Sequence, residues 1–271
     1  MRDKGFKQLT VDHYAGAASG WADGASLVYR PIARELIVTV PHDLRGRTVL
    51  DAGAGTGLAS EILLEHGARV VATDLSRDML GWQAAIRPPA AVADVCHLPL
   101  ADDSVDDAVG AFVLNHLTQP EAGLAELARV TRPGGAVVAC VFGNAGFGTA
   151  REVLDQAALA SGWPVPQWYL DLRAAVLPLL GTADAIAEVA RAVGLVAVTS
   201  EERPVDVGVD TAERLVDYRL GQAQFAPWVR ELGDRRTAEV KAVLADAVRP
   251  VMEPYRPHVV FLSALVPSAT L

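Results

Sequence analysis

The stretch Val49-Leu50-Asp51-Ala52-Gly53-Ala54-Gly55-Thr56-Gly57 decides the fold of this chain. It joins a short apolar run that starts at Thr48 to a segment with helical periodicity at Leu58–His66. A backbone that turns tightly between a strand and a helix, and lets a ligand approach closely, needs residues without a Cβ atom. The three glycines at alternating positions therefore predict a strand, a ligand-binding loop and a helix in succession.

Two details of this loop separate the ligands that it could bind. A dinucleotide-binding loop has the spacing G-x-G-x-x-G, and here the third glycine comes one residue early, with Leu58 in the dinucleotide position. Asp51 stands two residues before the first glycine, where a pyrophosphate gains nothing from a negative charge. Both details favour a ligand with a cationic amino-acid end over a diphosphate.

Two further acids follow expected strands. Asp74 comes directly after Val70-Val71-Ala72-Thr73, where a carboxylate can accept hydrogen bonds from both hydroxyls of a ribose. Asp94 ends the next short apolar run, where a carboxylate can accept the exocyclic amine of adenine. Each could instead be an exposed strand-end or helix-capping carboxylate. Three acids at the ends of three successive strands favour one shared site.

Short apolar runs alternate with helical patterns from about residue 47 onward. Such alternation, with strands that are apolar throughout, predicts an α/β fold whose mostly parallel sheet is covered by helices on both faces. Neither an internal repeat nor a Gly-, Ser- or Pro-rich linker interrupts it, so we expect a single domain over residues 1–271. The expected strands are 48–50, 68–73, 90–93, 108–113, 136–142, 195–199 and 258–266.

Composition excludes several classes of partner. The chain of 271 residues is 51% hydrophobic and 21% charged, with a formal net charge of −9, which disfavours nucleic acid because binding to phosphates usually needs a basic face. Its two cysteines, Cys96 and Cys140, predict neither a disulfide framework nor a zinc site. With no signal-peptide pattern and no apolar stretch of membrane-spanning length, we expect a cytoplasmic protein without a membrane partner.

Several segments outside the alternating core are too long to be simple connections. Residues 1–46 are expected to form an N-terminal helical lid over a cofactor-binding core at 47–142. Residues 143–182 and 211–255 are expected to form helical segments on the substrate side, because long connections often become lids or binding walls. The sequence leaves the oligomeric state open.

A set of motifs within residues 47–142 carries a family resemblance. They are Val49–Gly57, Asp74-Leu75-Ser76, Asp94 with Leu98-Pro99-Leu100, Asp102-Asp103-Ser104-Val105-Asp106, and Glu126–Gly135. As a set they resemble class I S-adenosylmethionine-dependent methyltransferases, in particular the small-molecule enzymes related to ubiquinone and menaquinone methyltransferases. The resemblance implies a Rossmann-like, seven-stranded sheet with an antiparallel last strand and helical lid insertions. It also implies S-adenosylmethionine as cofactor and S-adenosylhomocysteine as product.

The resemblance also assigns roles to residues. It implies that the glycine loop makes room for the methionine moiety, that Asp74 holds the ribose, and that the run Ala101–Asp107 is a polar turn whose acids are solvated and hold no metal. Leu75 and Met79 would flank the adenine, Asp94 with Val95 would bind its edge, and Phe112 would contact the cofactor through its backbone. The cofactor-binding candidates are therefore Tyr14, Tyr29, Asp51, Gly53, Ala54, Gly55, Gly57, Asp74, Leu75, Met79, Asp94, Val95 and Phe112.

Catalytic and substrate-binding candidates lie outside these motifs. His116 follows the fourth expected strand and is the first candidate for a general base, since an unperturbed imidazole pKa of about 6.5 suits proton transfer at neutral pH. His13 is a second candidate if the N-terminal segment covers the site. Trp21, Trp163, Trp168 and Tyr169 are expected to form substrate walls, and the alternative for each aromatic residue is packing in the core.

Three functional hypotheses follow. The first is methyl transfer to a small apolar or aromatic metabolite, with oxygen or carbon favoured because the loop after the fourth strand lacks an Asn-Pro-Pro-Tyr or Asp-Pro-Pro-Tyr run. The second is an NAD(P)-dependent oxidoreductase on the same sheet. The third is a protein that binds the cofactor without transferring its methyl group.

Overall fold

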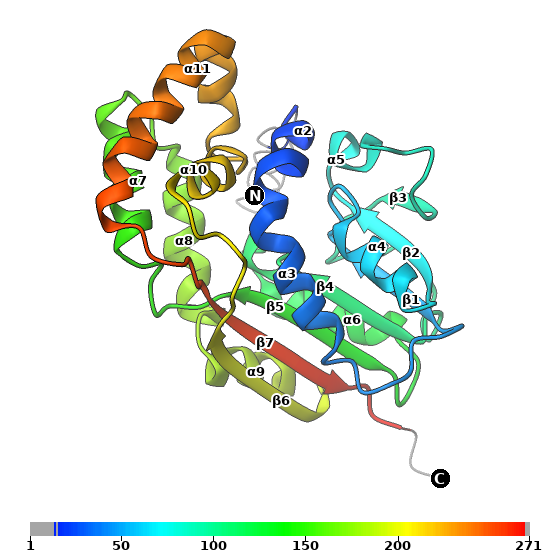
Figure 1. Ribbon diagram of the computed structural model, residues 1–271. Helices are drawn as coiled ribbons and strands as arrows, with labels where there is room; N and C mark the ends of the chain where they lie inside the picture. The colour runs from blue at the N-terminus through cyan, green and yellow to red at the C-terminus, as the bar shows by residue number, and fades with distance from the viewer. Residues whose placement is uncertain (1–13, 15, 269–271) are drawn as a thin grey trace.

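The structure, a computed structural model, describes residues 14 and 16–268. Its centre is a seven-stranded sheet with the order β3-β2-β1-β4-β5-β7-β6 (Figure 1). Strands β1 to β5 pair in parallel, and β7 runs antiparallel to both β5 and β6. The predicted Rossmann-like sheet with an antiparallel last strand is therefore confirmed. The strands are β1 (Thr48–Ala52), β2 (Arg69–Asp74), β3 (Ala90–Val92), β4 (Asp107–Ala111), β5 (Ala136–Phe142), β6 (Val196–Pro204) and β7 (His258–Leu265).

Most strand boundaries differ from the expected ones by a residue or more, and two of these differences change the architecture. The fourth strand was expected to continue to residue 113, but β4 ends at Ala111 because Phe112 has a φ of +60° and turns the chain away from the sheet. Strand β6 continues to Pro204 because it pairs with β7 along most of its length, at the edge of the sheet. The first difference places Phe112 at the carboxyl ends of the strands.

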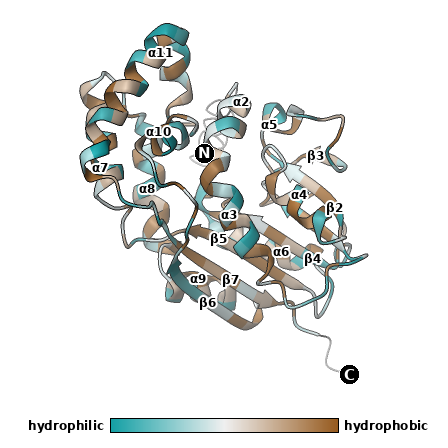
Figure 2. Cartoon of the chain, in the orientation of Figure 1, coloured by the Kyte–Doolittle hydropathy of each residue, from teal (hydrophilic) through white to brown (hydrophobic). Residues whose placement is uncertain are grey.

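Helices cover both faces, as predicted. Successive strand residues alternate between two cores, so that Val49 and Val138 belong to one core and Leu50 and Val137 to the other. On the first face lie α3 (Ser26–Ile37) and α4 (Leu58–Glu65), and on the second lie α6 (Pro120–Val130) and α9 (Ala183–Ala192). Figure 2 shows the central strands as mostly hydrophobic, in keeping with their burial on both sides.

A group of helices lies beyond one half of the sheet. Helix α11 (Ala226–Val248) packs against α7 (Thr149–Ala160) and α10 (Ala212–Leu220), and α8 (Gln167–Leu180) lies below them (Figure 1). These helices fall within the segments 143–182 and 211–255, whose substrate-side role stays a prediction. The remaining elements are α2 (Ala18–Gly20), η1 (Trp21–Ala25), α5 (Arg77–Gly81), η2 (Leu114–His116) and η3 (Arg249–Val251).

The N-terminal segment contributes to the core as well as to the site. Helix α3 buries Val28, Ile32 and Leu36 completely, so this part of residues 1–46 is a structural layer of the domain. The π-helical turn η1 precedes it and contacts α10. Whether the earlier residues act as a lid stays a prediction.

One acid of the polar turn departs from the expectation. Asp107 was expected to be solvated, but its side chain is fully buried, where it accepts hydrogen bonds from Arg47 and from the Ala136 amide and lies 2.9 Å from His42 Nδ1. A buried carboxylate needs such partners. Asp107 therefore holds the start of β4 to the segment before β1 and to β5.

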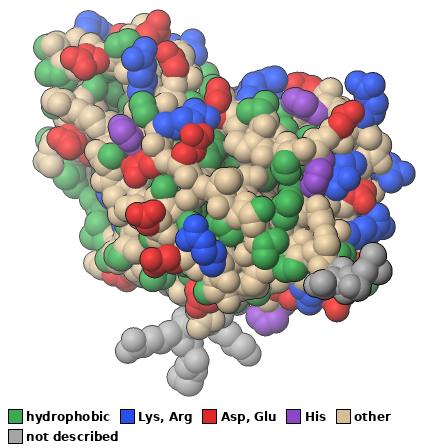
Figure 3. All heavy atoms as spheres, turned by 90° about the horizontal axis from the view of Figure 1, so that it is seen from below, with side chains coloured by type: hydrophobic (Ala, Val, Ile, Leu, Met, Phe, Trp, Pro, Cys, Tyr) green, Lys and Arg blue, Asp and Glu red, His purple; other side chains and the backbone are tan. Residues whose placement is uncertain are grey.

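The surface charge, the potential metal ligands and the hydropathy of the helices bear on the partners that the protein could have. Figure 3 shows acidic and basic side chains interspersed on the face seen from below. In the part of the chain that the structure describes, no group of three or more potential ligands is placed to hold a metal ion, and no disulfide joins Cys96 and Cys140. Among these residues no helix combines the length and the hydropathy needed to cross a membrane.

Candidate active site

The glycine loop turns sharply between β1 and α4. Gly53, Gly55 and Gly57 have φ angles of +71°, +54° and +97°, in the left-handed region that favours glycine. The amides of Gly53 and Ala54 both donate to the Thr73 carbonyl oxygen, at 2.8 and 2.9 Å, which ties the loop to β2. A Cβ atom on Gly53 would lie 2.5 Å from Cγ2 of Val113, so a side chain there would collide with the chain that follows β4.

Asp51, at the end of β1, is an incompletely paired buried acid. It is 1% exposed, and its Oδ2 accepts a hydrogen bond of 2.5 Å from the Ser60 hydroxyl. Its Oδ1 is buried without a hydrogen-bond partner among the described residues. Burial raises the pKa of Asp51 to about 6, although the hydrogen bond from Ser60 and the charge of Arg87 lower it. Such an oxygen is suited to a cationic donor.

Asp74 is the last residue of β2, and Asp94 lies two residues after the end of β3. The Asp74 oxygens accept hydrogen bonds from the Gly55 amide at 2.8 Å and the Ser76 amide at 2.7 Å, so this side chain holds the glycine loop against the start of α5. Burial raises the pKa of Asp74, and these backbone hydrogen bonds oppose the shift. The Asp94 Oδ1 accepts from the Cys96 amide at 2.9 Å and orders the turn after β3.

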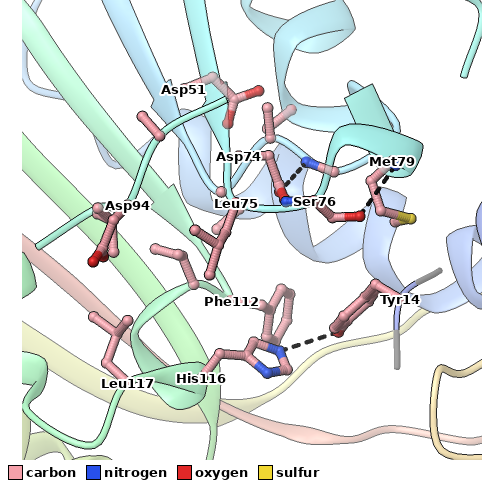
Figure 4. A pocket seen from close by; sticks show the side chains of 18 of the residues that line it. Tyr14, Asp51, Asp74, Leu75, Ser76, Met79, Asp94, Phe112, His116 and Leu117 are labelled. Atoms are coloured by element: carbon pink, nitrogen blue, oxygen red, sulfur yellow. Dashed lines mark hydrogen bonds between the residues drawn. The ribbon is translucent and has the colours of Figure 1, made fainter. Parts of the chain in front are cut away.

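These acids lie at the wall of the larger of two described cavities, which has a volume of about 280 Å³ (Figure 4). The three carboxylates Asp51, Asp74 and Asp94 line it, and no Lys or Arg of the described residues does. Gly57 does not line it; it forms the N-cap of α4 instead. The other cofactor-site candidates that line it are Tyr14, Tyr29, Gly53, Ala54, Gly55, Leu75, Met79, Val95 and Phe112.

Aromatic side chains close one end of this cavity. The ring centres of Trp21 and Tyr29 are 4.6 Å apart, and those of Tyr29 and Phe112 are 4.7 Å apart. Tyr14 Oη lies 3.3 Å from His116 Nε2 (Figure 4). Burial raises the pKa of Tyr14 well above its usual range and lowers the pKa of His116 to about 4, so both groups are neutral at pH 7. His116 Nδ1 is buried without a hydrogen-bond partner among the described residues.

A second cavity of about 100 Å³ adjoins the first, and Tyr14, Trp21, Tyr29 and His116 line both. Of the expected substrate walls, Trp21, Trp168 and Tyr169 line this second cavity. Its other lining residues include Phe142, Phe147, Arg151, Leu172, Arg173, Val176, Gln222 and Gln224.

Trp163 lies apart from the site, and a second candidate, His13, is not among the residues that the structure describes. Trp163 was expected to be a substrate wall, but it lines neither cavity and packs in the core, stacked on Phe225 with ring centres 3.9 Å apart. Its indole N–H donates to the buried Gln224 carbonyl oxygen at 3.2 Å, which satisfies the polar edge of the ring.

Sequence reasoning missed two arginines at the site. Arg151, in the first turn of α7, is 4% exposed and lines the second cavity. Arg87 lies behind the glycine loop and donates to the carbonyl oxygens of Gly55 and Leu80 at 3.2 and 2.9 Å. Arginines in helical or loop sequence are ordinarily exposed, so nothing in the immediate sequence marks Arg151 as buried or Arg87 as half-buried.

Comparison with known proteins finds methyltransferases that are similar to parts of this chain. Residues 50–139 match a family model described as a methyltransferase domain. The chain is 44% identical over 116 residues to a demethylmenaquinone methyltransferase of Mycolicibacterium paratuberculosis, a match that covers 41% of this chain and 50% of that protein. It is 39% identical over 125 residues to the protein of the same name from Renibacterium salmoninarum, covering 45% and 53%. The chain thus spans about half the length of the curated relatives it matches.

Solved structures resemble a larger part of the chain. Phosphoethanolamine N-methyltransferase 2 of Haemonchus contortus, solved with phosphomonomethylethanolamine and S-adenosylhomocysteine, has a TM-score of 0.58 and 17% identity over 88% of this chain and 52% of that one. The 4+2 cyclase SpnF has a TM-score of 0.55 and 18% identity over 89% and 81%. At such identities the likeness shows the fold. Residues 50–139 thus match the methyltransferase-domain family, and the described chain shares the Rossmann-like fold of solved S-adenosylmethionine-dependent methyltransferases.

Proposed function

We propose that the chain transfers a methyl group from S-adenosylmethionine to a small acceptor with an apolar or aromatic body, bound in the second cavity. The observation that carries this proposal is the lining of the first cavity: three carboxylates, a glycine loop and no Lys or Arg among its described residues. S-adenosylmethionine carries an ammonium and a sulfonium, which suit such a lining. The matches to methyltransferases point in the same direction.

The residues fit the cofactor group by group. The unpartnered Asp51 Oδ1 would accept a hydrogen bond from the ammonium of the cofactor. The Asp74 carboxylate, when ionised, has lone pairs left beyond those that accept the backbone amides, and these would accept the ribose hydroxyls. Met79 and Leu75 would pack on the adenine, while Asp94 and the chain at Val95 would bind its edge. These roles follow the family resemblance and the position of each residue in the cavity.

The shared aromatic boundary is where we place the transfer. When bound, the cofactor supplies an electrophilic methyl group; an electron pair of the acceptor, from an oxygen lone pair or from an electron-rich carbon, forms the new bond, and the electrons of the carbon–sulfur bond go to sulfur. Tyr14, Trp21 and Tyr29 would exclude water and attract the sulfonium through their ring faces, an effect worth ~0.5–2 kcal/mol. We favour oxygen or carbon as the methylated atom.

A nicotinamide cofactor suits the cavity less well. Its pyrophosphate would lie on the glycine loop between Asp51 and Asp74, where two carboxylates repel it and no described Lys or Arg lines the cavity. Arg87 lies behind the loop and donates to the Gly55 carbonyl oxygen instead. The comparisons match methyltransferases, so the oxidoreductase alternative is not favoured.

Titration calorimetry with S-adenosylhomocysteine at pH 7.5 tests the proposal. We expect binding with a Kd in the micromolar range, because substrate affinities of enzymes commonly lie between ~1 μM and ~1 mM. Labelled S-adenosylmethionine, incubated with small acceptors, should then transfer its methyl group. No heat at several hundred micromolar ligand would contradict cofactor binding, and binding without transfer to any acceptor would favour the non-methylating alternative.

His116 is proposed to accept the acceptor proton at Nδ1, with Nε2–H donating to Tyr14 Oη. We expect His116→Ala to reduce kcat about tenfold to hundredfold, at or below the lower end of the usual contribution of a general base, because a base of pKa about 4 has a small driving force. A lowered pKa keeps the imidazole neutral above pH 5, so kcat should fall only as the pH approaches 4. Rate–pH profiles of the wild type and His116→Ala measure this, with His66→Ala as control, since His66 lines neither cavity. An unchanged profile in His116→Ala would remove the base assignment.

A further inference from the structure

The second cavity contains a buried guanidinium that the proposed transfer does not use. Arg151 is 4% exposed, and its guanidinium carbon lies 3.5 Å from the centre of the Phe147 ring. Its hydrogen bonds to the hydroxyls of Tyr255 and Tyr169 are long, at 3.4 and 3.5 Å. Its Nε has no hydrogen-bond partner among the described residues. A buried cation with such weak partners has unused capacity to bind an anion.

The carboxylate beside Arg151 is already engaged. Asp155 Oδ2 lies 4.0 Å from Arg151 Nε, beyond hydrogen-bond distance. Both Asp155 oxygens accept hydrogen bonds from Arg219, at 2.8 and 2.9 Å, and Arg219 is itself fully buried. One carboxylate thus faces two buried guanidinium groups, and the pair of arginines leaves one positive charge uncompensated. Burying such a charge is costly unless a counter-charge joins it.

The charged side chains that line the two cavities have opposite signs: the first has carboxylates and the second has guanidinium groups. Among its described lining residues the second cavity has two arginines, Arg151 and Arg173, and no Asp or Glu. The Arg173 guanidinium carbon lies 5.6 Å from the centre of the Tyr169 ring. Burial raises the pKa of Tyr169, but the charges of Arg219, Arg151 and Arg173 outweigh it, and the pKa lies below its usual value. The electrostatic potential at this end of the cavity is therefore positive.

We infer that the second cavity binds an acceptor that carries a carboxylate, held by Arg151 and the Tyr169 hydroxyl, with Arg173 adding charge attraction. This inference rests on the proposed function, because it names the class of acceptor. The apolar body would lie against Phe142, Trp168 and Leu172. The reacting atom would lie at the other end, beside Tyr14 and His116, which both cavities share. An anionic acceptor then binds next to a cationic methyl donor.

Paired ligands test the inference without requiring turnover. Hydroxybenzoic, hydroxynaphthoic and hydroxycinnamic acids are each compared with their carboxamides, which keep the shape and remove the charge. Calorimetry is performed on protein saturated with S-adenosylhomocysteine, at pH 7.5. We expect at least one acid to bind about tenfold to hundredfold more tightly than its amide, as a charge-assisted hydrogen bond gives.

Variants connect the preference to Arg151. Arg151→Met should reduce the preference for acid over amide to less than about twofold, Arg151→Lys should keep part of it, and Arg173→Gln should reduce it by a factor of about two to five. Arg236→Gln is the matched control, because Arg236 is an exposed α11 arginine that lines neither cavity. An S-adenosylhomocysteine affinity equal to that of the wild type shows that a variant is folded. If Arg151→Met does not bind S-adenosylhomocysteine normally, the acid–amide comparison in the wild type and in Arg173→Gln tests the inference instead.

The outcomes separate this inference from the proposed function. A lack of S-adenosylhomocysteine binding would contradict the proposed function itself. If S-adenosylhomocysteine binds but no acid exceeds its amide, or if no acid binds at millimolar concentration, the carboxylate inference is overturned and the methyltransferase proposal stands. A preference that survives in both Arg151→Met and Arg173→Gln would also overturn it, since another group would then hold the carboxylate.

Discussion

Asp51→Asn is expected to make the ligand-free protein more stable while weakening its binding of S-adenosylhomocysteine. In the folded protein burial raises the pKa of Asp51 to about 6, from an unfolded value near 3.8. The folded state therefore binds the proton more tightly. The contribution of the protonated Asp51 to the free energy of unfolding is complete below pH 3.8 and is lost as the pH rises through 6. At pH 7.5 the buried, ionised carboxylate therefore lowers the free energy of unfolding by about 3 kcal/mol relative to the protonated form. An uncharged isostere removes that cost.

The same substitution removes the proposed partner of the cofactor ammonium. We expect the affinity for S-adenosylhomocysteine at pH 7.5 to fall about tenfold to hundredfold, because a hydrogen bond between charged groups is lost. Wild-type affinity should also fall about tenfold per pH unit below 6, since Asp51 must lose its proton to bind a cation, whereas the variant should lack this dependence.

Denaturant unfolding without ligand and calorimetry between pH 5 and 8 measure both effects. Asp184→Asn is the control: it changes the net charge equally at an exposed position in the first turn of α9 that lines neither cavity. A variant that binds as tightly as the wild type would show that Asp51 does not hold the ammonium.

Asp74→Ala is expected to weaken S-adenosylhomocysteine binding at least tenfold, about 1.4 kcal/mol. Two causes contribute. The carboxylate would no longer accept the ribose hydroxyls, and the amides of Gly55 and Ser76 would lose their shared acceptor, which loosens the glycine loop. Calorimetry at pH 7.5 gives the total effect.

A ligand lacking one hydroxyl separates the two causes. The 2′-deoxy analogue of S-adenosylhomocysteine should bind the wild type several-fold more weakly than the parent ligand, whereas Asp74→Ala should hardly distinguish them. Equal discrimination by both proteins would mean that Asp74 acts only through the loop and that the ribose assignment is wrong.

Much of the fold was predictable because local sequence determines it. The β1 segment, the glycine loop and the start of α4 follow from the order of apolar, glycine and helical residues in Val49–Gly57. The placement of Asp51, Asp74 and Asp94 in one cavity follows because carboxyl ends of parallel strands share one edge of a sheet. Neither inference needs knowledge of distant contacts.

The features that were missed depend on distant contacts. Trp163 packs on Phe225, 62 residues further along the chain by number, and Arg151 is buried by tyrosines from α8 and from the loop before β7. Burial of Asp107 depends on Arg47 and His42, from the segment before β1. Nothing in the periodicity near each residue records these partners. The depressed pKa of His116 has the same origin, because it results from burial among groups of other elements.

A crystal structure of the protein with S-adenosylhomocysteine tests the central claim most directly. We expect the ligand in the cavity between the glycine loop and Tyr14, with its ammonium on Asp51 Oδ1, its ribose hydroxyls on Asp74 and its adenine edge at Asp94. A ligand bound elsewhere, or bound here with Asp51 and Asp74 making no contact to it, would contradict the claim.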